Sequence, residues 1–247
     1  MIRGLYSGAA GLRTQATRMS IMGNNLSNSS TPGFKQDVAS VGPFPRLLLS
    51  RLVDGGQVAA RVGAVGTGAG LREVSLDLHQ GMLAESGKDL DLALDGAGFF
   101  ALQAPDGVRY TRAGSFSRDA DGQLSSSHGY PVLGEGGPIL LPNGPVRVQT
   151  DGTVYVGEER VSRVQVIDFP AGTQFRKTGS DLLQADGGTE VTTANVRQFS
   201  LEASNVDPVN LMVDLMSASR AYESSQRLLQ IQDQTLERAV NDVGRVG

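Results

Sequence analysis

Both ends of this chain carry apolar and small residues at alternating steps of three and four, and this spacing restricts each end to a helix with one narrow apolar seam. Seams of this kind are typical of coiled coils, whereas an ordinary surface helix has a broader apolar face. The N-terminal seam consists of Ile2, Leu5, Ala9, Leu12, Ala16, Met19, Gly23 and Leu26. The C-terminal seam consists of Leu211, Leu215, Ala218, Tyr222, Ser225, Leu229, Gln232, Leu236, Ala239 and Val243. We therefore expect a long helix at each end.

Capping and turn residues indicate where these helices begin and end. Short polar side chains at 24–31 compete for backbone hydrogen bonds, and a Pro-Gly pair at 32–33 forces a turn, so the first helix should end near residue 28. Asn205 or Asp207 can cap the second helix, whose first turn accepts Pro208. A helix of about 35 residues from there would be a rod roughly 50 Å long.

The two ends also have opposite charge. Residues 1–35 carry four cationic side chains and no acid, while residues 200–247 carry seven acids and four arginines. This asymmetry predicts that the two helices pair. The expected contacts join Leu5, Leu12, Met19 and Leu26 to Leu215, Tyr222, Leu229 and Leu236. Because burying one seam does not offset the entropy of ordering a whole helix, we expect both helices to be poorly ordered in the free monomer and to become firm when neighbouring subunits cover their other faces.

Turns, rather than a helical period, organise the middle of the chain. Glycine contributes 32 of the 247 residues, and tryptophan is absent, so many turns and a lean core are expected. Short apolar runs such as 98–102 and 161–169 read as strands, whereas residues 36–72 show no long period and read as an extended connector. The hairpin-type pairs are Asp106-Gly107, Asp121-Gly122, Asn143-Gly144, Asp151-Gly152 and Asp186-Gly187.

Residue types that catalysis needs are scarce. Cysteine is absent, and the two histidines, His79 and His128, lie far apart without a metal-binding or triad motif around them. A Gly-x-Gly-x-x-Ala spacing that begins at Gly96 and Gly98 matches the dinucleotide fingerprint, but that site needs a helix directly after it, and residues 99–102 are strand-like. The sequence therefore predicts no catalytic residue, metal or cofactor, and a dinucleotide-binding enzyme remains the alternative of a different class.

Charge and hydropathy also argue against a nucleic-acid-binding protein, a membrane-spanning segment and a secretory signal. A net charge of −4 disfavours a nucleic-acid partner. No run of 18 apolar residues is present, and the first 30 residues lack the apolar core of a secretory signal. The basic, acid-free start also fits an organelle transit peptide or a membrane-surface anchor, but both interpretations leave the C-terminal seam unexplained.

Four motifs, in the expected order, resemble the signatures of flagellar rod and hook proteins. They are Gly23–Asn28 with Thr31–Lys35, Leu94–Phe100, Tyr110–Phe116 with Asp121–Leu124, and Leu201–Asp207 with Arg220–Glu223. The terminal signatures include Asn24, Asn25, Leu26, Asn28, Gly33, Phe34, Ser204, Asn205 and Val206. Within the family, residues 129–139 and 206–209 are most similar to the rod protein beside the proximal segment, while the opening at 1–5 is usual for the distal rod protein.

This resemblance implies a non-enzymatic subunit of the basal-body rod. Such a subunit is exported unfolded through the flagellar type III apparatus and polymerises with copies of itself and other rod proteins into the shaft that carries torque from motor to hook. It would lie in the periplasm of a host with an outer membrane, with no nucleic acid or small-molecule substrate. A distal rod or hook-type paralogue is the alternative within the family, and a secreted coiled-coil adhesin, which would form a stable small oligomer, is a third class.

The expected fold class is α+β, with a mainly β middle domain and a coiled-coil-like axial domain made by the terminal helices. We expect four segments along the chain. They are an N-terminal axial helix at 1–28, an extended connector at 29–75, a β-rich outer domain at 76–195 and a C-terminal segment with the second axial helix at 196–247.

Overall fold

The computed structural model describes residues 2–44, 47–53, 57–66, 68–179, 181–190 and 195–243. The chain forms two compact units, each built from segments that are distant in sequence. Residues 1–26, 37–75 and 208–247 form the helical unit, and residues 27–36 and 76–207 form the β unit. Each expected segment is continuous in the sequence, whereas each unit combines segments that are distant in sequence. Residues 27–36, for example, belong to the β unit although they directly follow α1.

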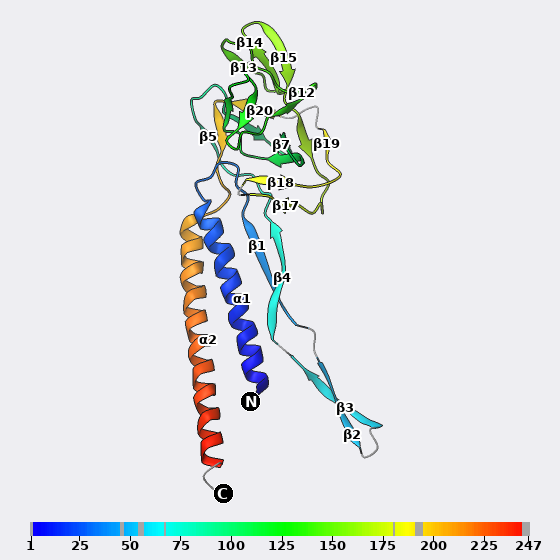
Figure 1. Ribbon diagram of the computed structural model, residues 1–247, viewed down its shortest axis with the longest axis vertical. Helices are drawn as coiled ribbons and strands as arrows, with labels where there is room; N and C mark the ends of the chain where they lie inside the picture. Colours follow the sequence, from blue (N-terminus) through cyan, green and yellow to red (C-terminus); the bar gives the residue numbers. More distant parts are fainter. Residues whose placement is uncertain are drawn as a thin grey trace. The chain divides into compact units, whose positions relative to one another are not determined.

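Two long helices dominate the helical unit, and the expectation of N- and C-terminal helices is confirmed. α1 spans Ile2–Ser27 and α2 spans Pro208–Val243. The helices lie side by side and run in opposite directions (Figure 1), with Gly8 of α1 against Leu229 of α2. Proline is well suited to the first position of α2 because an amide hydrogen there would have no partner within the helix. Within the described ranges, neither helix has the length and hydropathy needed to cross a membrane.

Paired strands occupy the region expected to be an extended connector. β1 (Asp37–Pro43) pairs with β4 (Ala69–Leu76), and β2 (Leu47–Val53) pairs antiparallel with β3 (Gln57–Val65). The β1/β4 ribbon packs on α1, where the Thr14 hydroxyl donates a hydrogen bond of 3.1 Å to the carbonyl of Ala69. A Cβ placed on Gly68 would lie 3.5 Å from the Cβ of Ala10. In the described part of the unit, α1 therefore contacts both α2 and the ribbon.

Short strands make up most of the β unit, as the sequence predicted. The strands are β5 (Leu83–Glu85), β6 (Leu92–Asp95), β7 (Phe99–Ala104), β8 (Gly107–Thr111), β9 (Phe116–Arg118), β10 (Leu124–Ser126), β11 (Leu133–Gly134), β12 (Gly137–Pro138), β13 (Val146–Val148), β14 (Thr153–Val156), β15 (Glu159–Arg163), β16 (Val166–Asp168), β17 (Arg176–Lys177), β18 (Leu182–Gln184), β19 (Thr189–Glu190), β20 (Asn195–Gln198) and β21 (Ser200–Glu202). The largest sheet has the order β17-β18-β8-β7-β16-β19. At its centre Phe100 is paired with Thr111 on one side and Val166 on the other.

The core of the β unit forms around Phe100, which is fully buried and packs edge-to-face on Phe116 at 5.2 Å between ring centres. Leucine and valine side chains from β6, β10, β14, β16, β18 and β20 contribute to this core, together with Ile139 directly after β12. The glycines of the five predicted hairpin-type pairs all have positive φ, namely Gly107, Gly122, Gly144, Gly152 and Gly187. Glycine adopts positive φ without strain. The pairs at 106–107, 121–122 and 151–152 form hairpin turns between paired strands, whereas those at 143–144 and 186–187 connect strands that do not pair with each other.

The structure also bears on the dinucleotide alternative. Gly96 and Gly98 are followed directly by strand β7, so the helix N-terminus that would face a pyrophosphate does not form there. Gly98 has a φ of 115°, and a Cβ on it would lie 2.6 Å from the Val166 side chain. Strand packing and turn geometry therefore account for this glycine pair.

Candidate functional site

The first candidate site is the contact between α1 and α2, which the seams predicted. An ideal Cβ on Gly8 would lie 2.6 Å from Cδ2 of Leu229, and one on Gly4 would lie 3.4 Å from the Gln232 amide. Leu229 therefore sits directly on the α1 backbone, and a larger residue at position 8 would require this side chain to shift. Because α1 and α2 run in opposite directions with the same rise per residue, the numbers of facing residues have a constant sum. This sum is about 237 for the pairs Gly8–Leu229 and Gly4–Gln232, so Met19 is level with Ala218 along the helix axes.

On α2 the predicted seam coincides with the covered face. Ala218 is buried, and Leu211, Leu215, Tyr222, Ser225, Leu229 and Leu236 are half-buried, while Gln232 is exposed. The side chains of Ala239 and Val243 lie outside the described residues. The covered positions keep the spacing of three and four, so one face of α2 packs within the unit and its other faces are open.

On α1 the covered face is rotated from the predicted seam. Leu5, Leu12, Met19 and Leu26 are half-buried, but Ala9 and Ala16 are exposed. Contact with α2 runs instead through the Gly4 and Gly8 positions. The reason is that small residues let Leu229 approach closely, while the ribbon covers a second side of the helix. The side chain of Ile2 lies outside the described residues.

The second candidate site is a buried ion cluster in the β unit, called here the motif junction and formed by Lys35, Arg112 and Glu202. Lys35 Nζ lies 2.6 Å from Glu202 Oε1, and Arg112 Nη1 lies 3.1 Å from Glu202 Oε2. All three side chains are at most 5% exposed. Each comes from a different motif, so one carboxylate links three segments that are distant in sequence.

Backbone groups complete the junction. Lys35 Nζ also donates to the carbonyl of His79 at 2.6 Å, and Arg112 Nη2 donates to the carbonyl of Gly96 at 2.6 Å. The amide of Gly81 donates to Glu202 Oε1 at 2.9 Å. Charge-assisted hydrogen bonds of this kind are stronger than neutral ones, which is what a buried ion cluster requires to offset its lost hydration.

Burial and the charge of Glu202 have opposite effects on the pKa values of Lys35 and Arg112. Burial lowers the pKa of Lys35 from its ordinary value, and the hydrogen bond and charge of Glu202 offset part of this effect. Burial likewise lowers the pKa of Arg112 against the opposing charge of Glu202. Glu202 is therefore the counterion on which both buried cations depend.

Close backbone packing surrounds the junction. Gly33 has a φ of 69°, and a Cβ on it would lie 2.2 Å from the backbone nitrogen of Ala113. A Cβ on Gly114 would lie 1.5 Å from the carbonyl oxygen of Leu92, and one on Gly81 would lie 2.0 Å from that of Ala203. The chain segments cross here at distances that only glycine permits.

The other family-motif residues are placed as follows. Asn25 is buried in the helical unit and exchanges two hydrogen bonds with the backbone of Asp37, whereas Asn24 is exposed and Leu26 is half-buried. In the β unit, Asn205 accepts a hydrogen bond from the backbone amide of Gln36 and donates one to the carbonyl of Asp77.

The remaining motif residues also lie in the β unit. Asn28 accepts a hydrogen bond from the hydroxyl of Thr31, and the ring of Phe34 lies under the Lys177 ammonium at 4.1 Å. The Ser204 hydroxyl accepts a hydrogen bond from the amide of Val206, which is buried. These residues fix turns and crossings.

Sequence reasoning did not single out Lys35, Arg112 or Glu202, although all three stand inside the motifs that it used. The available signal was that three of the motifs each contain a charged residue beside small and apolar neighbours. A charged side chain in such surroundings suggests a buried ion pair, because charged residues are rarely buried without a partner. No three histidine and carboxylate side chains gather closely enough to hold a metal ion in the part of the chain that the structure describes.

Comparisons with known proteins agree with the arrangement of the motifs. Three family models match, and they are described as flagella basal body rod protein over residues 5–35, flagellar hook protein FlgE/F/G D1 domain over 93–156, and flagellar basal body rod FlgEFG protein C-terminal over 197–242. The flagellar basal-body rod protein FlgF of Caulobacter vibrioides is 34% identical and covers 100% of this chain and 99% of its own length. The chain belongs to the flagellar basal-body rod protein family.

Other relatives in this family match over nearly their whole length. The flagellar basal-body rod protein FlgG of Bacillus subtilis is 29% identical over 98% of this chain and 99% of its own length. The FlgF protein of Salmonella typhimurium is 29% identical over 97% of both chains. The relatives carry the names of structural rod components, and no catalytic family is indicated.

Proposed function

We propose that this structural subunit of the flagellar basal-body rod polymerises through α1 and α2, which form a coiled-coil-like axial core of the shaft. The observation that supports this is the incomplete packing of the helices. The covered seam of α2 occupies one face, while large apolar side chains remain exposed on others, among them Met212, Met216 and Ile231. Exposed apolar faces of this extent mark sites of protein–protein contact.

In this proposal many parallel contacts carry torque from the motor to the hook. Burying a further apolar face of each helix gives the association energy, and the rigid helices transmit the load. The motif junction serves the same purpose inside the β unit, because it ties the residues that follow α1 in the sequence to those that precede α2. The proposed assembly residues Leu5, Leu12, Met19, Leu26, Leu215, Tyr222, Leu229 and Leu236 form the seam that joins α1 to α2 in this core, and the exposed apolar faces join one subunit to the next.

The partners in this proposal are copies of the same chain and other rod proteins. The flagellar type III apparatus exports the chain unfolded to the basal body, which lies in the periplasm where the host has an outer membrane. FlgF and FlgG relatives both match over nearly the full length, and we place the chain with the FlgF-type rod protein, with the distal rod or hook-type paralogue as the alternative.

A single substitution tests the proposal. Leu229→Asp puts a charge against the backbone of Gly8 and should abolish rod assembly and motility, while the β unit unfolds at the same temperature as before. Ser224→Asp, at an exposed position on the same helix, is the matched control and should leave motility intact. Wild-type motility of the Leu229→Asp strain would overturn the proposal.

A further inference from the structure

α1 and the β1/β4 ribbon border an open groove of about 540 Å³. Its lining includes Tyr6, Ala9, Arg13 and Thr17 on α1 with Phe44 and Leu71 on the ribbon. These α1 positions are not the Gly4 and Gly8 positions that face α2. Tyr6 is 75% exposed and Phe44 is 42% exposed, so the groove has apolar walls that are open to solvent.

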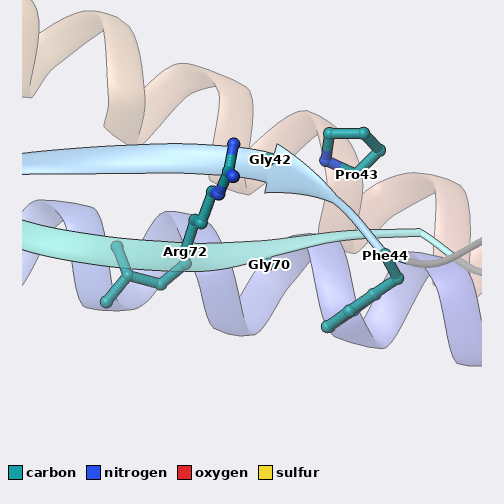
Figure 2. A pocket seen from close by; sticks show the side chains of 6 residues that line it. Gly42, Pro43, Phe44, Gly70 and Arg72 are labelled. Carbon is teal, nitrogen blue, oxygen red and sulfur yellow. The ribbon is translucent and has the colours of Figure 1, made fainter.

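Figure 2 shows the ribbon side of this region. The ring of Phe44 lies beside Gly70, and Arg72 extends from β4 across to Gly42 on β1. A Cβ on Gly70 would lie 2.7 Å from the Phe44 ring. Glycine at this position therefore leaves room for the Phe44 ring, which lines the groove.

The first two turns of α2 carry an exposed apolar stripe with the spacing of a helix that docks into a groove. Val209, Met212, Val213 and Met216 are 68%, 48%, 55% and 53% exposed. They occupy positions i, i+3, i+4 and i+7, which lie on one side of a helix. The stripe is roughly 10 Å long and the α1 wall of the groove, from residue 6 to residue 17, is roughly 16 Å long, so the stripe fits within it.

The stripe of a chain is too far along the axis to fill the groove of the same chain. Facing residues of α1 and α2 have numbers that add to about 237, as Gly8 and Leu229 do, so Met216 is level with residue 21 of its own α1. The middle of the groove lies about ten residues, or roughly 15 Å, further along. Only another molecule can bring such a stripe to the groove.

We propose that the groove of each subunit binds the 209–216 stripe of a second copy of this chain. The inference rests on the proposed polymerisation and names the surfaces that it uses. Charge favours the pairing, because Arg13 is the charged residue among the described residues that line the groove and none of these is acidic, whereas residues 207–219 include Asp207 and Asp214 and no cation. The methionines suit the site because their flexible side chains fill irregular apolar gaps.

This contact joins two different surfaces, so it is head-to-tail, and it extends into an open filament when contacting copies are displaced along the axis. Copies in such a filament share one direction, and the stripe therefore runs antiparallel to the α1 that it contacts. In this arrangement Met216 lies at Ala9 of the neighbour instead of level with residue 21, a displacement of twelve residues. Contacting copies are thus offset by about 18 Å along the helix axis.

Cysteine pairs test both the contact and its direction, because the chain has no cysteine of its own. Ala9→Cys with Met216→Cys should give disulfide-linked dimers and longer ladders in isolated basal bodies under mild oxidation. Ala9→Cys with Val209→Cys is the matched control, since the antiparallel direction keeps these positions apart. In neither variant can the two cysteines join within one chain, because a disulfide requires Cα atoms within about 7 Å. We expect at least tenfold more ladder from the first pair.

Three outcomes are informative. Abundant ladders from the Met216 pair alone support the inference. Rods that assemble and give no ladder from this pair, or equal ladders from both pairs, overturn it and leave the proposed function standing. A wild-type chain that never enters rods overturns the proposed function itself. As a second readout, Met216→Glu should reduce rod assembly at least tenfold without changing the unfolding of the β unit, and unchanged assembly would count against the docking.

Discussion

Buried apolar side chains are concentrated in the β unit, whereas the described part of the helical unit contains only Met22 and Ala218 among them. The large apolar residues that remain exposed show the reverse distribution, because most of them lie on α1, α2 and the β1/β4 ribbon. Burial of apolar area is the main favourable contribution to folding. The β unit therefore contains what it needs to fold, and the helical unit lacks part of the surface that would stabilise it.

Polar interactions differ between the units in the same way. The β unit holds its segments together with a buried ion cluster and with backbone crossings at Gly33 and Gly114. In the helical unit, the contacts of α1 with α2 and the ribbon use small side chains and single hydrogen bonds such as that from Thr14 to Ala69. A subunit that completes its packing only in a polymer has its stable part in the first unit and its adaptable part in the second.

The largest expected effect is on hydrogen exchange in the free monomer. Amides of α1 and α2 should exchange at least about a hundredfold faster than those of β7, β8 and β16, because local opening of the helices exposes few buried apolar groups. Exchange followed by mass spectrometry on the full chain measures this directly. Equal protection of both units would break the comparison and with it the expectation that the helices become firm on assembly.

Removing the counterion of the motif junction should destabilise the β unit strongly. Glu202→Gln keeps the shape of the side chain but leaves Lys35 and Arg112 buried without an opposite charge, which should cost about 3–5 kcal/mol of unfolding free energy. Urea unfolding monitored by near-ultraviolet circular dichroism measures the change. Glu85→Gln, an exposed carboxylate on the neighbouring strand β5, should cost less than about 0.5 kcal/mol. Similar losses in both variants would contradict a role for the cluster.

A pair of glycines separates the effect of packing from that of backbone conformation. Gly33 and Gly87 have φ angles of 69° and 71°, but a Cβ would meet backbone at Gly33 and nothing within 4 Å at Gly87. Gly87→Ala should therefore lose about 1–2 kcal/mol from its left-handed conformation alone. Gly33→Ala should lose about 1–3 kcal/mol more through overpacking. Equal losses in thermal unfolding would show that the segment crossing is loose.

The smallest expected effect is a pH dependence in the turn between β9 and β10. Asp119 accepts hydrogen bonds from the amides of Gln123 and Asp121 and from the hydroxyl of Ser125, and these bonds hold its pKa below the ordinary value despite some desolvation. The stabilisation is present above pH 3.8, near the unfolded-state pKa, and is lost as the pH falls through the folded-state pKa.

Asp119→Asn should accordingly flatten the loss of β-unit stability below about pH 4, as measured by urea midpoints across that range. Asp121→Asn is the matched control, because the Asp121 carboxylate accepts none of these three hydrogen bonds. An acid dependence that is the same in wild type and Asp119→Asn would assign the effect to other carboxylates.

Hairpin turns and helices were readable from the sequence because each depends on local chemistry. Three of the five Asp-Gly and Asn-Gly pairs, at 106–107, 121–122 and 151–152, join strands that pair with each other, as such pairs predict. The pairs at 143–144 and 186–187 also have glycines with positive φ, but they lie in turns between strands that do not pair. The run at 161–169 was less readable, since it forms β15 and β16 with a break at Val164 and Gln165. Val164 is buried and bridges to Gly134, and a contact with such a distant residue leaves no local pattern in the sequence.

The seam of α2 and the covered face of α1 show where the limit lies. On α2 the described seam positions other than Gln232 are covered, so a single periodicity describes most of its covered face. α1 packs on both α2 and the ribbon, and its residues divide between two contacts, which is why Ala9 and Ala16 are exposed although they fit the seam. One sequence period describes one face and cannot describe two.

The sequence by itself determined the two terminal helices, the β-rich middle and the four family motifs, because periodicity, turn chemistry and short signatures are properties of neighbouring residues. Only the tertiary structure decided that Lys35, Arg112 and Glu202 meet in one buried cluster, and that α1 and the ribbon border a groove. These features depend on residues more than 25 positions apart in the chain. Their pairing is set by which segments the fold brings together, and local sequence patterns carry no record of that choice.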